Sequence, residues 1–405
     1  MPFCEVGKYQ YGSADNSGSG VNGTKIFYRT YGRGPIKVLC IIGFAGTHDS
    51  WGPQIKGLTG SEIPNDDLLS PHEPIPGEDG FGGDNGGIEM CAFDNRGVGR
   101  SSVPTKRSEY STTIMAKDAI ALMDHLGWNK AHVFGHSMGG MIACKLASMV
   151  PKRILSLALL NVTGGGFECF PRLDRQTLSV GIRFIRAKTP ELRAAVDLDT
   201  HYTKEYLEEY VGNSTRREIL HQEYVKGITS SGMQSSYGFE GQINACWTHK
   251  MTQPEIERMC AAGFLISVIH GRYDIIAQIY YARRLAERLY PFSRMVDLHG
   301  GHLVSHERTQ EVVNQALLDL IKASEEKVSA QDWTNLPKKN TGSLSSLSFS
   351  RSNAEGETKL TYTFYMMEKF HLVLLYIFGL CTYALEYGRL TMKSLKPDRV
   401  GASLT

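Results

Sequence analysis

The sequence predicts an α/β fold in which a mostly parallel, wound β-sheet is flanked by helices and carries an inserted helical cap. In this 405-residue chain, short apolar runs typical of buried strands alternate with stretches of helical spacing. Strands that alternate with helices in this way indicate β-α-β units and an open parallel sheet. The alternation stops between Gly164 and Ala262, where amphipathic stretches rich in Arg, Glu and Tyr replace the strand-like runs. We therefore expect a helical cap inserted between two strands of the sheet.

The predicted strands include a nearly continuous apolar run at residues 36–44, a pattern that suits a strand covered on both faces by helices. The first two are separated by a turn at Gly32–Gly34, and the third, within MCAFDNRGVGRSS, ends in a glycine turn. The strands are expected at residues 25–31, 36–44, 90–93, 131–134, 155–162, 264–271 and 294–300.

The predicted helices are stretches whose apolar residues recur with helical spacing. The first of them, for example, places Met115, Ala119 and Leu122 on one face. The helices of the core are expected at residues 113–126, 141–149, 275–290 and 306–323, and those of the cap at 172–187 and 203–211.

The predicted domain order follows from these patterns and from shifts in composition. Residues 58–88 are rich in Gly, Asp and Pro, so we expect a polar surface insertion there. Residues 343–352 contain six serines, which indicates a linker. The expected segments are a first part of the α/β core at 1–163, a helical cap at 164–262, a second part of the core at 263–325, a polar serine-rich linker at 326–360, and an apolar segment with a basic tail at 361–405.

The charge of the chain is nearly balanced, with 44 basic residues, 42 acidic residues and a net charge of +2. A protein that binds a polyanion usually carries a clear basic excess, so we expect no nucleic-acid partner. The hydrophobic residues, 41% of the chain, are sufficient for a large core and exclude wholesale disorder.

The eight cysteines include no C-x-x-C pair, and several lie inside apolar runs, as Cys40 does. This distribution is typical of buried free thiols and not of a disulfide framework or a zinc site. We expect no metal and no cofactor. The N-terminal sequence lacks the basic and apolar regions of a secretory signal, so we expect an intracellular protein whose folded domain is cytoplasmic.

The strongest chemical signal is Gly135-His136-Ser137-Met138-Gly139, a G-x-S-x-G motif. It follows the strand-like run AHVF and opens the helical run MIACKLASM, and such a hairpin forces its central residue into a strained backbone conformation. Glycine is needed two residues before and after the serine, because a Cβ there would clash with the neighbouring strand or helix. We predict that Ser137 is a nucleophile; the alternative is a glycine-rich helix entry without chemistry.

A serine hydroxyl needs a base, and that base needs an orienting carboxylate. Among the 13 histidines, His302 is favoured because Gly300-Gly301-His302 follows the last predicted strand and precedes a helix. The glycines would let the backbone carry the imidazole over the carboxyl edge of the sheet. His299 and His306 are the nearby competitors, for which solvated or capping roles are expected.

The carboxylate is expected after a strand that lies between the serine and the histidine. Asp274 fits, because it stands three residues past Gly271, where a predicted strand ends. Aspartate also favours the cap of a following helix, and the two roles are compatible. Asp297 is the rival, but it lies within the last predicted strand, from which its side chain cannot readily reach the sheet edge.

Taken in order, Ser137, Asp274 and His302, with the elbow motif, the run HGRYD and the run GGH, resemble the α/β-hydrolase fold superfamily. The GHSMGG elbow resembles the serine esterase and lipase branch, because the epoxide hydrolase and dehalogenase branches use aspartate at this position. The resemblance covers about residues 25–325 and includes the cap insertion.

Two further runs resemble that superfamily. The run DNRGVGRS, which begins at Asp94, resembles its D-x-R-G-x-G-x-S turn. Gly43-Phe44 followed by Trp51 resembles its oxyanion loop, although Ile42 replaces the usual histidine before that glycine.

The resemblance implies an acyl-transfer mechanism. His302 takes the proton of Ser137 as general base, and the serine attacks an acyl carbon. The backbone N–H groups of Met138 and Phe44 hold the developing oxyanion. Asp274 fixes the tautomer of the imidazole, and water then releases the acyl group.

We predict a serine hydrolase that cleaves a carboxylic ester, or a thioester or amide, of a small-molecule or lipid-like substrate. Two alternatives from other classes stay open. One is a hydrolase-fold ligand receptor or scaffold with little turnover, and the other is a cofactor-free peroxidase or C–C bond hydrolase that uses the same residues. The cap at 164–262 is expected to select the substrate.

The segment 370–387 is expected to contact a membrane. Between Phe370 and Leu385, only His371, Gly379 and Thr382 interrupt the apolar run. A spanning helix needs about 20 residues, so we expect either a transmembrane helix or an interfacial helix. The alternative is a helix docked on the protein's own surface.

Overall fold

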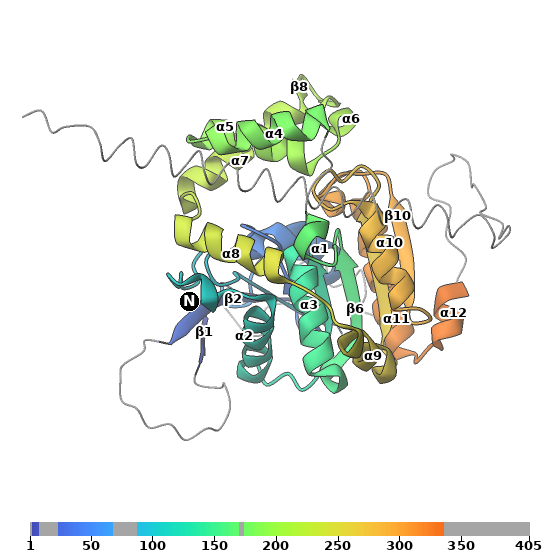
Figure 1. Cartoon of the computed structure of the whole chain (residues 1–405). Coiled ribbons are helices and arrows are strands. Elements are labelled where there is room, and N and C mark those ends of the chain that lie inside the picture. The colour runs from blue at the N-terminus through green and yellow to red at the C-terminus, as the bar shows by residue number, and fades with distance from the viewer. Residues whose placement is uncertain (1, 8–22, 68–86, 170–173, 336–405) are drawn as a thin grey trace, which may run out of the picture. The chain divides into compact units, whose positions relative to one another are not determined.

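The computed structural model describes residues 2–7, 23–67, 87–169 and 174–335. Its centre is an eight-stranded sheet with the order β1-β2-β4-β3-β5-β6-β9-β10 (Figure 1). The strands are β1 (Phe3–Val6), β2 (Thr24–Tyr31), β3 (Ile36–Ile41), β4 (Ile88–Phe93), β5 (Ala131–His136), β6 (Ile154–Leu160), β9 (Leu265–Gly271) and β10 (Ser293–Leu298). The pairs β1–β2 and β2–β4 are antiparallel, and all the others are parallel. The predicted mostly parallel sheet is confirmed.

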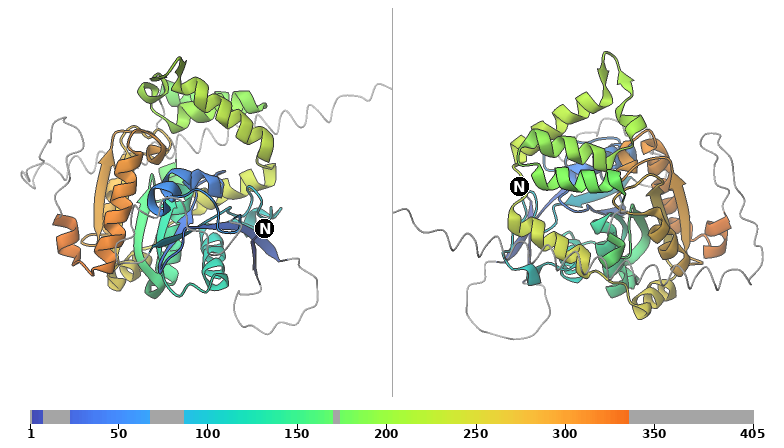
Figure 2. Two further views of the ribbon diagram at one scale, coloured as in Figure 1. Left: turned by 180° about the vertical axis from the view of Figure 1, so that it is seen from behind. Right: turned by 45° about the horizontal axis from the view of Figure 1, so that its top comes forward.

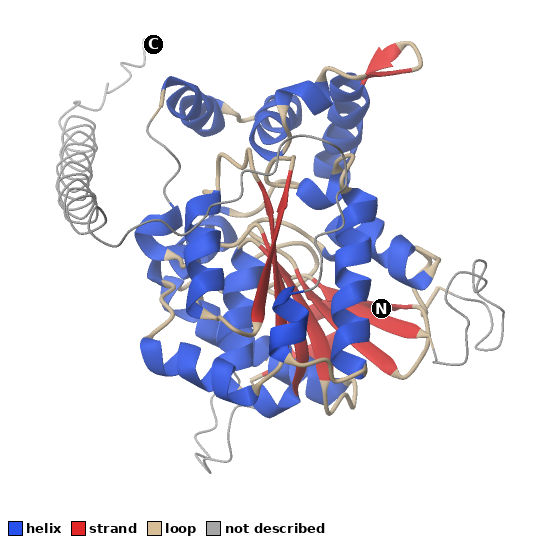
Figure 3. Cartoon of the chain, turned by 90° about the vertical axis from the view of Figure 1, so that its right-hand side faces the viewer, coloured by secondary structure: helices blue, strands red, loops and turns tan. Residues whose placement is uncertain are grey.

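Helices cover both faces of this sheet, as Figure 3 shows with helices in blue on either side of the red strands. They are α1 (Gly52–Thr59), α2 (Thr112–His125), α3 (Met138–Met149), α9 (Gln253–Ala262), α10 (Ile279–Arg288), α11 (Gln310–Glu325) and α12 (Ala330–Asn335). Buried residues of α2, α3, α9 and α10 share one apolar cluster with Val133 of β5, and those of α1, α11 and α12 share a second with Phe134. Because successive side chains of a strand point to opposite faces, the two helix groups lie on opposite faces of the sheet.

Further helices stand between β6 and β9 in the sequence, and Figures 1 and 2 show α4, α5 and α7 as a layer above one end of the sheet. The elements of this region are α4 (Arg175–Arg186), α5 (Pro190–His201), α6 (Lys204–Leu207), β7 (Tyr210–Val211), β8 (Ser214–Thr215), α7 (Arg216–Ser231) and α8 (Ser236–Thr248). The last helix before β9, α9, instead packs against α3. A separate cap domain at 164–262 stays a prediction.

The helix expected at 203–211 is shorter in the structure. Thr203 caps α6 with its side chain, and the helix ends at Leu207. A small hairpin of β7 and β8 follows, and its turn contains Gly212 with φ = 64°. A positive φ suits the tight turn of a two-residue hairpin, which the helical spacing of the preceding residues does not reveal.

The polar insertion expected at 58–88 begins later than its composition indicates. Leu58 belongs to α1 and is buried. The Asn65 side chain donates a hydrogen bond of 2.8 Å to the backbone oxygen of Gly32, so the chain is held against β2 and its turn up to this point. Residues 68–86 lie outside the described residues.

The linker expected at 326–360 also begins later. Trp333 of α12 is 1% exposed, and its indole nitrogen donates a hydrogen bond of 3.0 Å to the backbone oxygen of Ile266 in β9. One large aromatic side chain thus attaches a polar stretch to the sheet, and composition does not predict this. Residues 336–360 lie outside the described residues.

Among the seven described cysteines, which are free thiols, Cys4, Cys40, Cys91 and Cys144 are buried, whereas Cys169, Cys246 and Cys260 are only partly buried. Cys381 lies outside the described residues. Within the described ranges, no helix combines the length and the apolar character needed to cross a membrane. The segment 370–387 lies outside those ranges. Its membrane contact and the expected cellular location therefore stay predictions.

Candidate active site

Ser137 stands at a sharp turn between β5 and α3, with φ = 54° and ψ = −122°. This conformation is strained for a residue with a side chain. The turn is tightly packed: a Cβ on Gly135 would lie 2.5 Å from the backbone oxygen of Gly139, and one on Gly139 would lie 2.0 Å from that of Ile41 in β3. Glycine at both positions therefore lets helix and strand approach closely enough to hold the serine at the turn.

Asp274 follows β9, and its carboxylate is fully buried. Its Oδ2 lies 2.7 Å from Nδ1 of His302 and accepts a hydrogen bond of 2.8 Å from the Asn161 side chain. Its Oδ1 accepts hydrogen bonds of 2.8 Å from the backbone N–H groups of Ile276 and Ala277. Burial by itself favours the protonated carboxyl, but His302 and the hydrogen bonds outweigh it and lower the pKa of Asp274 to about 2. The carboxylate is ionised near neutral pH and orients the imidazole.

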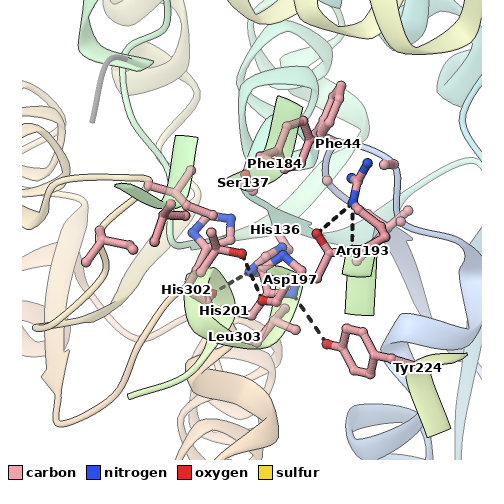
Figure 4. A pocket seen from close by; sticks show the side chains of 18 of the residues that line it. Phe44, His136, Ser137, Phe184, Arg193, Asp197, His201, Tyr224, His302 and Leu303 are labelled. Atoms are coloured by element: carbon pink, nitrogen blue, oxygen red, sulfur yellow. Dashed lines mark hydrogen bonds and ion pairs between the residues drawn. The ribbon is translucent and has the colours of Figure 1, made fainter. Parts of the chain in front are cut away.

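Ser137 and His302 line one cavity of about 470 Å³, shown in Figure 4. Within the described chain, Ser137 Oγ has no hydrogen-bond partner, and such contacts often form only when a substrate binds. The ring centroids of His136 and His201 lie 4.9 Å and 6.2 Å from that of His302. Burial lowers the pKa of both neighbours, that of His201 to about 3, so they add no positive charge beside His302 near neutral pH.

The loop after β3 approaches the serine, and buried amide side chains hold it. Asn95 donates a hydrogen bond of 2.7 Å to the backbone oxygen of Ile42. Gln242 of α8, which is 0% exposed, accepts a hydrogen bond of 2.9 Å from the Ala45 N–H and donates one of 3.0 Å to the Arg96 oxygen. These bonds support the loop that carries Ile42 in place of the expected histidine.

The two backbone N–H groups that the resemblance predicts as oxyanion donors lie at the site, one in the loop after β3 and one at the elbow. Phe44 lines the cavity, and Met138 is the first residue of α3. In the described part of the chain, the backbone N–H groups of Phe44 and Met138 have no internal acceptor. Both amides are therefore free to donate to a bound oxygen.

The alternative candidates for the base and the carboxylate do not line the cavity. The ring of His299 contacts that of Tyr273, with centroids 4.7 Å apart. His306 Nδ1 lies 3.1 Å from Ser305 Oγ, and neither histidine lines the cavity. Asp297 forms ion pairs with surface arginines. Among the described residues, no group of three or more His, Cys, Asp or Glu side chains could hold a metal ion.

The sequence model of the family described as alpha/beta hydrolase fold matches residues 37–309. The chain belongs to the α/β-hydrolase fold family. "Bifunctional epoxide hydrolase 2" of Sus scrofa is 28% identical over 139 residues, which are 34% of this chain and only 20% of that protein. "Putative carbamate hydrolase RutD" of Azorhizobium caulinodans is 22% identical over 295 residues, or 72% of this chain and 93% of that protein.

Solved structures share this α/β-hydrolase fold. The enol-lactonase from Burkholderia xenovorans LB400 aligns with a TM-score of 0.55 and 20% sequence identity, and the alignment covers 75% of this chain and 99% of the enol-lactonase chain. At this level of identity, the likeness shows the fold and not the activity.

Some residues of this α/β-hydrolase site belong to no sequence motif, so the sequence analysis did not identify them. Asn161 follows β6 and reaches Asp274, which follows β9, because these two strands are neighbours in the sheet. Gln242 reaches the loop after β3 from α8. Neither residue belongs to a local motif, so only the topology could reveal them.

Glu307 is a further unmarked residue beside the site. It accepts hydrogen bonds from the Gly301 N–H, next to His302, and from the Thr203 hydroxyl at the start of α6. Burial raises the pKa of Glu307 from 4.5 to about 7, although these hydrogen bonds act in the opposite direction. The histidine loop and the segment before α6 are thus joined through one buried carboxyl group.

Protonation of Glu307 is expected to stabilise the fold. The folded chain binds this proton more tightly than the unfolded chain, so the contribution is complete below about pH 4.5 and is lost as the pH rises to about 7. The free energy of unfolding of the wild type, minus that of Glu307→Gln, should therefore decrease over this range in urea titrations. Glu326→Gln, at a side chain that is 58% exposed, is the control, and an equally flat difference for both variants would contradict the expectation.

Proposed function

We propose that this α/β-hydrolase is a serine hydrolase that cleaves a carboxylic ester, or a thioester or amide, through an acyl-enzyme on Ser137. The observation that carries the proposal is a strained serine that shares one cavity with a histidine bonded to a buried carboxylate. Because Asp274 engages Nδ1 of His302, the other ring nitrogen is left for the serine hydroxyl.

The proposed reaction has two halves. In the first, His302 Nε2 takes the hydroxyl proton, Ser137 Oγ bonds to the acyl carbon, and the amides of Phe44 and Met138 donate to the oxyanion. His302 then gives its proton to the leaving alcohol, thiol or amine as the bond to that group breaks. In the second half, water attacks the acyl-enzyme with the same histidine as base, which frees the acid and restores the serine.

A fluorophosphonate probe tests the activated serine. Attack by Ser137 Oγ on phosphorus forms an O–P bond and releases fluoride, so the wild type should be labelled and Ser137→Ala should not. Absence of labelling in the wild type would contradict the proposal and favour a ligand receptor on this fold. Labelling without hydrolysis of any ester, thioester or amide would favour the peroxidase or C–C hydrolase alternative.

Gln242 is expected to affect catalysis through the oxyanion loop. Gln242→Ala leaves the Ala45 N–H without its acceptor and frees the loop that carries Phe44. A lost hydrogen bond to a buried group costs about 1–3 kcal/mol, so kcat should fall about ten- to hundredfold with little change in KM. Steady-state ester hydrolysis measures both constants.

Asn244→Ala is the matched control for this variant. Asn244 lies on the same helix and donates to the backbone oxygens of Arg107 and Tyr110, away from the loop. It should lower stability without lowering kcat. If the two variants lose kcat equally, the effect belongs to the anchoring of α8 and not to the loop.

A further inference from the structure

Two cavities meet at the serine. The polar lobe has a volume of about 470 Å³ and the apolar lobe one of about 430 Å³, and Phe44, Ser137 and Ile276 line both. The residues that characterise the polar lobe are Phe184, Arg193, Asp197, His201, Tyr224 and His302. Those that characterise the apolar lobe are Met141, Ile243, Cys246, Trp247 and Ala277. A substrate whose reactive carbon lies at Ser137 can therefore extend one half into each lobe.

The apolar lobe suits a hydrocarbon group. None of its lining residues, all of them described, has an acidic or basic side chain. Burial raises the pKa of the Cys169 and Cys246 thiols, that of Cys169 to about 11, so these groups are also uncharged near neutral pH. Apolar surface that enters this lobe loses its contact with water at little polar cost.

The polar lobe contains an ion pair whose arginine uses only one of its three nitrogens as a hydrogen-bond donor within the described residues. Arg193 and Asp197 lie one turn apart on α5, and Arg193 Nε lies 2.8 Å and 3.0 Å from the two carboxylate oxygens. The guanidinium carbon lies 4.1 Å from the centre of the Phe184 ring. In the part of the chain that the structure describes, both Nη nitrogens of Arg193 are without an acceptor. Figure 4 shows this pair beside His201, in the same cavity as Ser137.

The charges of this lobe favour an uncharged ligand group. Burial raises the pKa of the Tyr224 phenol, which is therefore uncharged near neutral pH. Apart from the histidines, Arg193 and Asp197 are then the lining residues that carry charge, and together they are neutral. A carboxylate or phosphate bound at Arg193 would place a second negative charge beside Asp197, where both side chains are less than one-fifth exposed and charges are only partly screened. A hydroxyl group avoids this repulsion, because it can accept from an Nη group and donate to the carboxylate.

We propose that Arg193 and Asp197 form a subsite for an uncharged, hydroxyl-bearing half of the substrate, while the apolar lobe holds its hydrocarbon half. This rests on the proposed function of Ser137 and specifies its substrate class. The polar half is recognised by hydrogen bonds to charged groups, and the hydrocarbon half by burial. The reactive carbon then lies where the lobes meet.

Binding of hexyl ethers, which the protein cannot hydrolyse, tests the subsite in calorimetric titrations of the full chain. Glycerol monohexyl ether presents hydroxyl groups, hexyl methyl ether presents none, and hexyloxyacetate presents an anion. The wild type should bind the glycerol ether about ten- to hundredfold more tightly than the methyl ether, as hydrogen bonds to charged groups predict. It should bind the glycerol ether more tightly than hexyloxyacetate. Equal or reversed affinities in either comparison would overturn the proposal.

Variants of Arg193 and Asp197 test whether this ion pair causes the preference for the glycerol ether. Arg193→Met should abolish it, and Arg193→Met combined with Asp197→Asn should do the same without leaving a buried carboxylate unpaired. Arg183→Met is the matched control: Arg183 of α4 forms an ion pair of 2.7 Å with Asp199 of α5, the helix that carries the proposed subsite, but it lines neither lobe. A preference that survives in the double variant, or that Arg183→Met also abolishes, would refute the subsite.

Fluorophosphonate labelling of Ser137 in the same samples separates the two proposals. A protein that is labelled but shows no preference for the glycerol ether retains the serine hydrolase function and lacks the subsite. A protein that binds the glycerol ether selectively but is not labelled has the subsite, and the catalytic proposal fails instead.

Discussion

Replacing Ser137 by alanine is expected to lower kcat for p-nitrophenyl butyrate by about 10⁴–10⁶-fold, and replacing His302 by alanine should have a similar effect. The two groups act in one step, because the hydroxyl can attack only while the imidazole removes its proton. The rate that is left comes from the oxyanion donors and from substrate binding, which neither variant changes. Steady-state hydrolysis by the purified chain measures the loss.

The double variant decides whether the two residues form a unit. Ser137→Ala combined with His302→Ala should be about as slow as either single variant, because the second substitution removes nothing that still functions. A double variant far slower than both, or a His302→Ala protein that keeps its activity, would show that the base is another residue. His306→Ala, in the same loop region, should stay close to wild-type activity, since His306 does not line the cavity.

Asp274→Asn is expected to lower kcat by about 10⁴-fold, because an amide at this position selects the wrong tautomer of His302. The backbone N–H groups of Ile276 and Ala277 donate to Oδ1, so the amide oxygen must occupy that place. The amide nitrogen then replaces Oδ2 and presents N–H to His302 Nδ1. That ring nitrogen becomes an acceptor, the proton moves to Nε2, and the imidazole can no longer act as base toward Ser137.

Asp297, the alternative carboxylate considered in the sequence analysis, provides the control for Asp274→Asn. Asp297 lies on β10 and pairs with Arg272 and Arg283, whose side chains are 54% and 51% exposed. Because exposed ion pairs contribute only about 0–1 kcal/mol, Asp297→Asn should leave kcat nearly unchanged. Steady-state kinetics of both variants, with circular dichroism to establish that each is folded, makes the comparison. An active Asp274→Asn protein, or an inactive Asp297→Asn protein, would reverse the roles given to the two carboxylates.

Features that depend on neighbours in the sequence could be predicted. The strand predicted at 131–134 and the helix predicted at 141–149 could be recognised from their apolar runs, because nearly all of their side chains are buried; the structure extends them to Ala131–His136 and Met138–Met149. The strained Ser137 could also be predicted, since the two glycines that permit its turn lie within the same pentapeptide. Composition was a weaker guide: it missed the burial of Leu58 and Trp333, where single apolar side chains anchor polar stretches.

The order of the chain determined the sheet and elbow of this protein, whereas the tertiary structure alone decided which residues surround them. Gln242 and the Ala45 amide are 197 residues apart in the sequence, and Asn161 and Asp274 are 113 apart. Arg193 and Asp197 form an ordinary ion pair one turn apart on a helix, and nothing local tells whether their face meets solvent or a cavity. Such contacts arise only after the topology has brought distant strand ends and helices together. A hydrogen bond or an enclosed charge depends on distance in space, which sequence separation does not encode.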